Sequence, residues 1–225
     1  MEIVDEQVRK DILAASGNII VSASAGSGKT TIMVNKILKK MSEISDHKTV
    51  AAITFTVKAT EEIKRKSKQI GGNNKFVVMT NDSFVEYEII RPFLIDALGE
   101  MYNNDFVISY EDSVKSGSFD EGLNILEKSN KLGTYHNIKR NFKFELAKKV
   151  LEQSTAAQEY FKSKYTMIFL DEYQDSDTDM HNLFMYIKNV LLIDLFIVGD
   201  GKQAIYLWRG AQRNIFNQLE NEGMQ

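Results

Sequence analysis

The chain has 225 residues, 43% of them hydrophobic and 26% charged, with a formal net charge of −3. These values are ordinary for a globular protein that forms one large domain, or one domain with an insertion. The absence of cysteine excludes disulfide bonds, thiolate metal sites and a cysteine nucleophile. No apolar stretch is long enough to cross a membrane and the N-terminus is not a signal peptide, so we expect a cytoplasmic protein without membrane partners.

In chain order, the spacing of apolar residues predicts a short amphipathic helix over 5–15 and then alternating strands and helices. Strands are expected at 18–23, 49–55, 76–79, 166–170 and 193–198, and helices at 29–43, 58–70, 81–90, 178–190 and 211–219. This alternation indicates an α/β fold in which helices cover both faces of a parallel sheet. Between 91 and 165 the alternation stops, and the only proline and two or three helical patterns predict a helical insertion, clearest over 141–153.

The segment IIVSASAGSGKTT, residues 19–31, predicts a strand, a tight glycine-containing loop and a helix. Gly26 and Gly28 allow successive backbone N–H groups to point at phosphate oxygens, and the following helix adds its positive N-terminal dipole. Lys29 would reach the β- and γ-phosphates, and the Thr30 hydroxyl would hold Mg²⁺. Ala23 stands where the pattern G-x-x-x-x-G-K-[ST] has its first glycine, and an ordinary glycine-rich turn is the alternative. The predicted nucleotide-binding residues of this segment are Ala25, Gly26, Ser27, Gly28, Lys29, Thr30 and Thr31.

A second motif, MIFLDEYQD at 167–175, begins with a continuous apolar run that is typical of a parallel strand covered on both faces. Asp171 at its end would organise the magnesium shell, and Glu172 would act as the base for an attacking water. A solvated acidic turn is the alternative interpretation. Together the two motifs predict a protein that binds ATP with Mg²⁺ and cleaves it.

Two segments are locally basic in this weakly acidic chain. Residues 58–68 contain five Lys and Arg against two Glu, and residues 139–149 contain five against one. Either could contribute to a nucleic-acid face or be an ordinary solvated helix face. Phe142 and Phe144 lie within the second segment, where core packing is an alternative role for one of them.

Further segments follow in an order that resembles superfamily 1 helicases of the UvrD, Rep and PcrA type. AAITFTVKATEEIKRK (51–66) resembles motif Ia, VVMTNDSF (77–84) motif Ib, FLDEYQDSD (169–177) motif II, and IVGDGKQAIYLWRGA (197–211) motif III. Gln7 matches the glutamine of the Q motif. The chain is thus similar to the first motor domain of such a helicase. The resemblance implies a RecA-like domain formed by 1–90 and 166–225, with an insertion subdomain at 91–165.

The resemblance also implies roles for single residues. Gln7 would bind adenine; without the resemblance it would be interpreted as a surface glutamine of a helix. Gln203 would act catalytically by contacting the γ-phosphate. Asp200 would lie near the magnesium waters. Among the implied DNA-binding residues, Thr54, Thr56 and Lys58 would contact phosphates, and Phe55, Tyr206 and Trp208 would stack on bases. Arg209 would either bind DNA or couple motif III to the ATP site. For Phe55, core packing is the rival role.

Several positions depart from the family pattern. Val57 replaces an asparagine of motif Ia, Asp82 a histidine of motif Ib, and Thr31 an arginine that stacks on adenine in many relatives. Motif III reads GDGKQ where GDDDQ is common. Motifs IV to VI, which lie on the family's second motor domain, are absent from these 225 residues, so we expect this chain alone to be poorly active.

The resemblance implies an ATP-driven DNA helicase that translocates 3′ to 5′ on single-stranded DNA. Its partners would be single-stranded DNA or single/double-strand junctions, and a second motor domain in the same or another chain. RNA as the track stays open, because base stacking tolerates both nucleic acids. The alternatives are a P-loop ATP switch that recruits a partner such as a nuclease, and a P-loop kinase or transferase.

Overall fold

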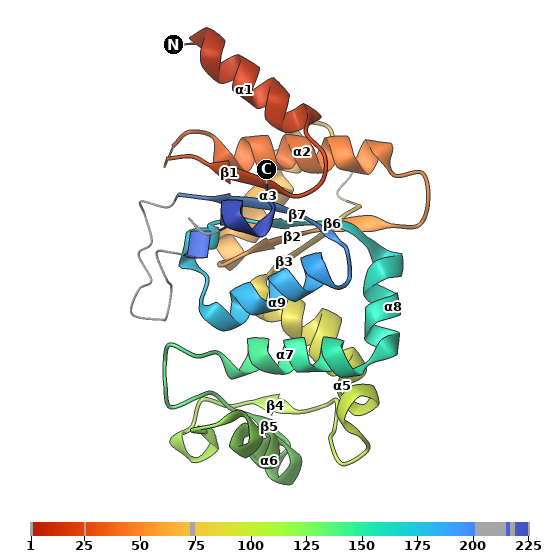
Figure 1. The fold of residues 1–225 in the computed structure, drawn as a ribbon, viewed down its shortest axis with the longest axis vertical. Coiled ribbons are helices and arrows are strands. Elements are labelled where there is room, and N and C mark those ends of the chain that lie inside the picture. The colour runs from red at the N-terminus through yellow and green to blue at the C-terminus, as the bar shows by residue number, and fades with distance from the viewer. Residues whose placement is uncertain (1, 25, 73–74, 201–214, 217–218, 225) are drawn as a thin grey trace.

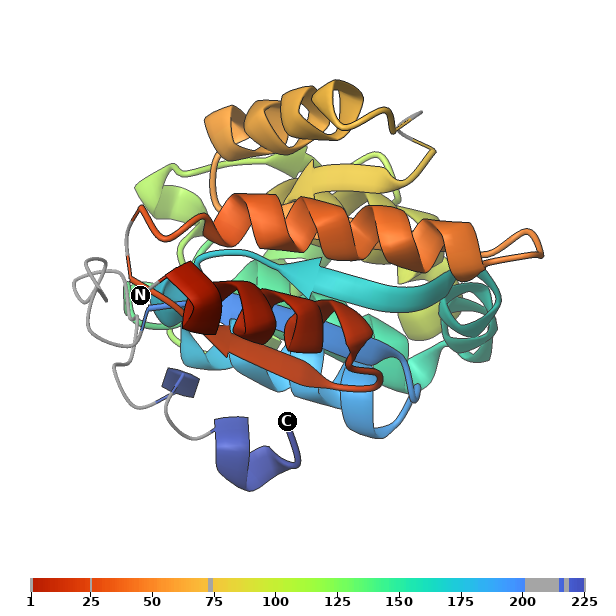
Figure 2. The ribbon, with the colours of Figure 1, turned by 90° about the horizontal axis from the view of Figure 1, so that it is seen from above.

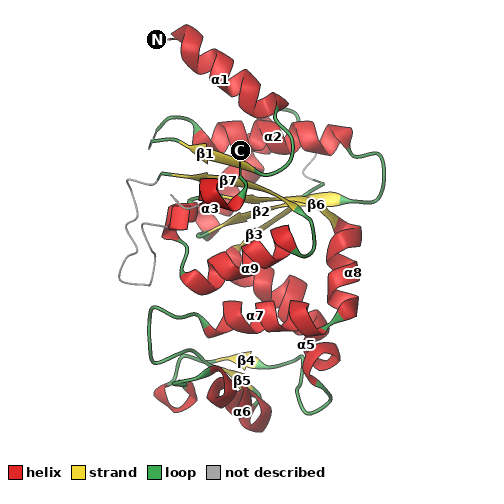
Figure 3. Ribbon diagram, in the orientation of Figure 1, coloured by secondary structure: helices red, strands yellow, loops and turns green. Residues whose placement is uncertain are grey.

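The computed structural model describes residues 2–24, 26–72, 75–200, 215–216 and 219–224. Its centre is a five-stranded parallel sheet in the order β1-β7-β6-β2-β3 (Figures 1 and 3). The strands are β1 (Ile19–Ser22), β7 (Asp194–Gly199), β6 (Tyr165–Leu170), β2 (Thr49–Thr54) and β3 (Val77–Thr80). Nearly every residue of β2, β6 and β7 is buried, as expected for strands that are covered on both faces.

Two helices cover one face of the sheet, and a third packs against the first of them. The covering helices are α2 (Lys29–Glu43) and α3 (Val57–Gln69), and α1 (Glu2–Ala14) packs against α2; in Figure 2, seen from above, α1 lies over β1. Apolar residues of α2 and α3, such as Met33 and Ile63, pack on β-strand residues such as Val50 and Phe169 to form one core. This layer fixes the start of α2 against the end of β1.

The other face is covered by α7 (Phe142–Gln153), α8 (Thr155–Lys164), α9 (Thr178–Asn189) and the helical run after β3. At its centre Phe84, fully buried, lies 5.9 Å from Phe161, 6.1 Å from Tyr165 and 6.4 Å from Phe184, measured between ring centroids. Residues of the 91–165 segment thus share one core with the sheet.

The helix expected over 81–90 is part of a longer helical run. It consists of α4 (Asn81–Phe84), a π-helical stretch η1 (Val85–Ile90) and α5 (Arg91–Leu98), capped by the Thr80 hydroxyl. The Arg91 N–H donates to the Glu86 carbonyl five residues back, immediately before Pro92. In a regular α-helix a proline ring clashes with the carbonyl four residues back, which the wider π turn avoids. The predicted domain boundary at 90/91 lies inside this run, and the division into domains stays a prediction.

The 91–165 segment is mostly helical but also forms a small sheet that we did not expect. Strands β4 (Val107–Ile108) and β5 (Lys131–Leu132) pair in parallel beside the short helix η2 (Asp112–Val114) and α6 (Phe119–Ser129), below α7 in Figure 1. Such two-residue strands carry too little periodicity to be recognised in a sequence.

The predicted fold class, a parallel sheet flanked by helices with a helical insertion, is confirmed. All five predicted strands are present and end within two residues of the expected positions. The helix expected over 211–219 falls mostly outside the described residues, which end with the 3₁₀ turn η5 (Leu219–Glu222) and the two residues after it. In the part of the chain that the structure describes, no helix is long and apolar enough to cross a membrane.

Candidate nucleotide and nucleic-acid site

The carboxyl ends of the parallel strands meet at one edge of the sheet, where ligands of open α/β sheets bind. The loop after β1 carries the first motif, and the turn after β6 carries the second. The Ala23 N–H donates to the Gly199 carbonyl (3.0 Å) at the end of β7, which ties the first loop to this edge.

The first loop has the backbone that its glycines predict. Gly26 and Gly28 have φ values of 76° and 86°, in the left-handed region that other residues rarely adopt. Gly28 is the N-cap of α2, and its carbonyl accepts from the Thr31 and Ile32 N–H groups (2.9 and 3.0 Å). The start of α2, with its positive dipole, therefore faces the loop.

The two motifs meet through their charged side chains. Lys29 is 8% exposed, and its Nζ lies 3.3 Å from Oε2 of Glu172, which is 143 positions further along the chain. The pairing of β1 with β7 and of β7 with β6 brings these residues together. A buried cation thus lies beside the carboxylate predicted to act as a base.

Asp171 lies deeper at the same edge. Its N–H donates to the Ile53 carbonyl of β2 (3.0 Å), and its carboxylate accepts from the Glu172 N–H (3.0 Å). Burial, and then the charge of Glu172, raise the pKa of Asp171 to about 6. A carboxylate that is costly to ionise without a cation is a suitable ligand for Mg²⁺, with Thr30 at the start of α2 as the second expected ligand.

Glu172 adopts an unusual backbone conformation, with φ 52° and ψ 40°. A non-glycine residue in the left-handed region is uncommon and often occurs at functional sites. The conformation directs its carboxylate to two donors, Lys29 and the Gln174 amide (2.7 Å). Gln174 also accepts from the Asp200 N–H (3.0 Å), so one side chain connects motif II to the end of β7.

Sequence reasoning missed three residues at this edge. Gln174 lies inside the recognised string DEYQD but was given no role. Arg9 of α1 donates from Nη2 to the Ser27 carbonyl (2.7 Å). Lys66 of α3 lies 3.3 Å from the Thr31 hydroxyl and 2.9 Å from Glu62. Of these three residues, only Gln174 could have been assigned a role from the sequence, because it lies inside the motif DEYQD.

The remaining predicted nucleotide residues are placed as follows. Gln7 is exposed on α1, and its amide donates to Asp11 on the same helix (2.8 Å). Gly26 and Ser27 are exposed, whereas Thr30 and Thr31 are half-buried. Ala25 and Gln203 lie outside the described residues.

A cavity of about 260 Å³ lies beside the ends of β2 and β3 and includes the predicted DNA residues Phe55 and Thr56. Phe55 is half-buried, with part of its ring against the core, so both of its expected roles are compatible with its position. Thr54 is 1% exposed, and its hydroxyl donates to the Thr56 carbonyl (3.0 Å). Thr54 therefore does not line the cavity. Lys58 is exposed. Tyr206, Trp208 and Arg209 lie outside the described residues.

The cavity wall also carries carboxylate and amide side chains and one guanidinium. It includes Asp82, Asp175 and Asp177, together with Asn81, Asn141 and Arg140. Burial raises the pKa of Asp177. Such a wall favours neutral, hydrogen-bonding groups over phosphates.

The basic segment 139–149 is not a free nucleic-acid face. Phe142 and Phe144 are both 2% exposed and belong to the core. Lys143 is buried and pairs with Asp82 (3.2 Å), Lys148 pairs with Glu152, and Arg140 pairs with Asp179 (3.0 Å) and Glu145. Three of its five basic side chains are therefore paired with carboxylates within the fold.

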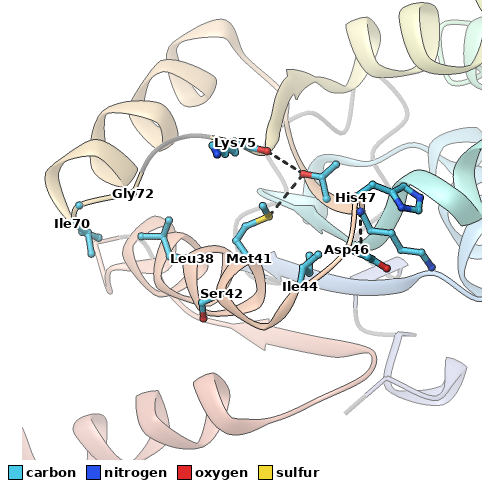
Figure 4. Close-up of a pocket in the computed structure, with 12 residues that line it drawn as sticks. Leu38, Met41, Ser42, Ile44, Asp46, His47, Ile70, Gly72 and Lys75 are labelled. Carbon is cyan, nitrogen blue, oxygen red and sulfur yellow. Dashed lines mark hydrogen bonds between the residues drawn. The ribbon is translucent and has the colours of Figure 1, made fainter.

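A larger hollow, of about 770 Å³, lies at the opposite edge of the sheet, near the C-terminal ends of α2 and α3 (Figure 4). Its lining includes Met41 and Lys75, and the Thr49 hydroxyl at the start of β2 donates to the Lys75 carbonyl (3.2 Å). It lies at the amino ends of the strands, away from both phosphate motifs, and is separate from the candidate site.

The fold and this edge define a P-loop nucleotide-binding domain. A protein-family model described as an AAA domain matches residues 6–209. Gabija protein GajB of Bacillus cereus (strain VD045) is 53% identical over 211 residues, which cover 94% of this chain and 42% of that protein. ATP-dependent DNA helicase Rep of Buchnera aphidicola subsp. Acyrthosiphon pisum is 26% identical over 250 residues, covering 89% and 38%. An ATP-dependent helicase/nuclease subunit of Lactobacillus johnsonii is 28% identical over 172 residues, covering 66% and 14%.

The chain belongs to this AAA-domain family and is a helicase-like ATP-binding domain, the N-terminal motor domain of the UvrD, Rep and PcrA type. It spans less than half the length of each of these relatives.

Proposed function

We propose that the complete protein hydrolyses MgATP to drive translocation on single-stranded DNA, 3′ to 5′, and to unwind duplexes. The observation that carries this proposal is the contact between Lys29 and Glu172, at 3.3 Å, with Gln174 linking Glu172 to Asp200. A site that only binds nucleotide needs the lysine, whereas hydrolysis also needs a carboxylate placed for water.

The loop and the start of α2 would bind the phosphates through backbone N–H groups and Lys29. Thr30 and Asp171 would hold magnesium, which neutralises charge on the β- and γ-phosphates when bound. Because Asp171 is buried and its pKa is raised, ionising it is costly until a cation is present. Gln203 is proposed as the contact to the γ-phosphate.

Glu172 would take the proton of the attacking water. In the structure its carboxylate accepts from Lys29 and Gln174. Both donors bond the same oxygen, Oε2, so when phosphate oxygens attract Lys29 this oxygen would keep only the Gln174 contact and the carboxylate would become a better proton acceptor. Gln174 keeps the side chain oriented and, through Asp200, connects this event to motif III.

We propose that the cavity beside Phe55 accepts a base of single-stranded DNA. Its acidic and amide wall would repel phosphates but can form hydrogen bonds with base edges. Thr56 and Lys58 would contact the backbone at the rim, and Tyr206, Trp208 and Arg209 are also proposed to bind the DNA. Thr54 would act by supporting Thr56 rather than by touching DNA.

Further parts of the proposal concern partners. A second motor domain, in the same or another chain, would complete the ATP site. The relative from Lactobacillus johnsonii is named as part of a helicase/nuclease, which supports a nuclease as a partner. An ATP switch that recruits such a partner, with little motor activity, is the second candidate function.

The test is ATP hydrolysis with and without saturating single-stranded DNA, together with MgATP binding, in the wild type and two variants. Glu172→Gln is expected to keep MgATP binding and to lower the hydrolysis rate about 10²–10⁴-fold. Glu159→Gln, at an exposed position on α8, is the matched control and should match the wild type. Hydrolysis by Glu172→Gln at the wild-type rate would contradict its role, and turnover that DNA does not raise would favour the switch.

A further inference from the structure

Arg9 of α1 contacts the phosphate-binding loop from outside the two motifs. Its Nη2 donates to the Ser27 carbonyl (2.7 Å). A Cβ added at Gly28 would lie 3.3 Å from Nη2, 3.4 Å from Nη1 and 3.8 Å from Cζ. The guanidinium is therefore packed against the two loop residues that precede Lys29.

The position of Arg9 is fixed because α1 is attached to α2. Lys36 of α2 is 4% exposed, and its ammonium donates to the carbonyls of Ile12 (3.0 Å), Leu13 (2.9 Å) and Ala15. These are carbonyls at and just beyond the C-terminal end of α1, which have no partner within a helix. The helix that begins at the phosphate loop thus also holds the helix that carries Arg9.

The site geometry indicates where the nucleoside end of a bound nucleotide would lie. The terminal phosphate belongs beside Lys29 and Glu172, at the end of β6. Strand β7 separates β6 from β1, and β1 forms the edge of the sheet. A nucleotide whose last phosphate points to β6 extends in the other direction, toward the β1 edge, and α1 lies over this edge (Figure 2).

We propose that Arg9 binds the nucleoside of the bound nucleotide, with its guanidinium plane stacked on the base. This inference rests on the proposed ATP site. A guanidinium is planar, always charged and weakly hydrated, so it stacks on aromatic rings while its edge continues to donate hydrogen bonds. The bond to Ser27 holds this plane in place before the nucleotide arrives, which lowers the entropy cost of binding.

The test compares two ligands by calorimetry, MgATP and magnesium tripolyphosphate, of which only the first has a nucleoside. Arg9→Ala is expected to weaken MgATP binding about tenfold and to leave tripolyphosphate binding within about twofold. Lys10→Ala is the matched control, because Lys10 is an exposed neighbour on α1 that pairs with Glu6 on the same helix. It should change neither affinity.

Two further variants separate the possible explanations. Arg9→Lys can still donate to the Ser27 carbonyl but has no plane to stack, so it should behave like Arg9→Ala toward MgATP. Equal weakening of both ligands by Arg9→Ala, or full recovery of MgATP binding by Arg9→Lys, would show that Arg9 only shapes the loop. Lys29→Ala should weaken both ligands; if it weakens neither, the proposed phosphate site itself is wrong.

Discussion

Replacing Asp171 by asparagine should stabilise the ligand-free protein, although it should abolish the proposed magnesium site. The Asp171 residue is 5% exposed, and burial together with the Glu172 charge raises its pKa from 3.8 to about 6. Each pKa unit corresponds to about 1.4 kcal/mol, so the ionised carboxylate costs about 3 kcal/mol of folding free energy. The asparagine side chain would be close in shape, and its carbonyl oxygen could still accept from the Glu172 N–H.

The effect should depend on pH in a defined direction. Because the pKa is higher in the folded state, the cost is fully present above about pH 6. It decreases as the pH falls toward 3.8, the ordinary value, and disappears below it, where both states are protonated. We therefore expect Asp171→Asn to raise the free energy of unfolding by about 3 kcal/mol at pH 8 and by almost nothing at pH 3.5.

Chemical denaturation at pH 8, 6 and 3.5, without magnesium or nucleotide, measures this difference. Asp105→Asn, at an exposed position, is the control and should stay within about 0.5 kcal/mol of the wild type at every pH. An Asp171→Asn variant that is equally or less stable than the wild type at pH 8 would refute the reasoning, because ionised Asp171 would then have favourable partners in the folded state.

Two other predictions concern parts of the fold away from the magnesium site. Lys36→Met keeps the aliphatic stem but removes the ammonium that bonds the end of α1, so amide hydrogen exchange in α1 should become faster while β2 keeps its protection. Unchanged exchange in α1 would contradict this. Gly133→Ala should lower the free energy of unfolding by about 1–3 kcal/mol or more, since its Cβ would lie 1.8 Å from the Val114 carbonyl oxygen. Gly117→Ala, with nearest contact at 3.4 Å, is the comparison, and an equal loss in both variants would count against a local clash.

The Gln174 side chain connects the Glu172 carboxylate to the end of β7. Its amide bonds both the Glu172 carboxylate and the backbone of Asp200. Gly199 beside it has no room for a side chain, because an added Cβ would lie 2.8 Å from the Gln174 amide oxygen and 2.6 Å from Phe216. A movement of the Glu172 carboxylate would therefore shift Gln174 and, through it, the backbone at Asp200 in motif III.

Much of the architecture was determined by local sequence. The apolar runs that became β1, β6 and β7 predicted a parallel sheet, because only strands covered on both faces are apolar throughout. Given a parallel sheet, residues that follow strands must meet at one edge, and Lys29 and Glu172 do so. The glycines at 26 and 28 have the left-handed backbone that the phosphate-loop pattern requires.

Other features depended on the tertiary structure. The attachment of Arg9 to Ser27, the bridge from Gln174 to Asp200 and the burial of Lys143 beside Asp82 each join residues that are distant in sequence or bury a charge. Periodicity predicts which face of a helix is apolar, but it does not show which polar side chain will meet which loop. Those contacts are set by how helices pack on the ordered sheet, and this order is fixed only when the whole core forms.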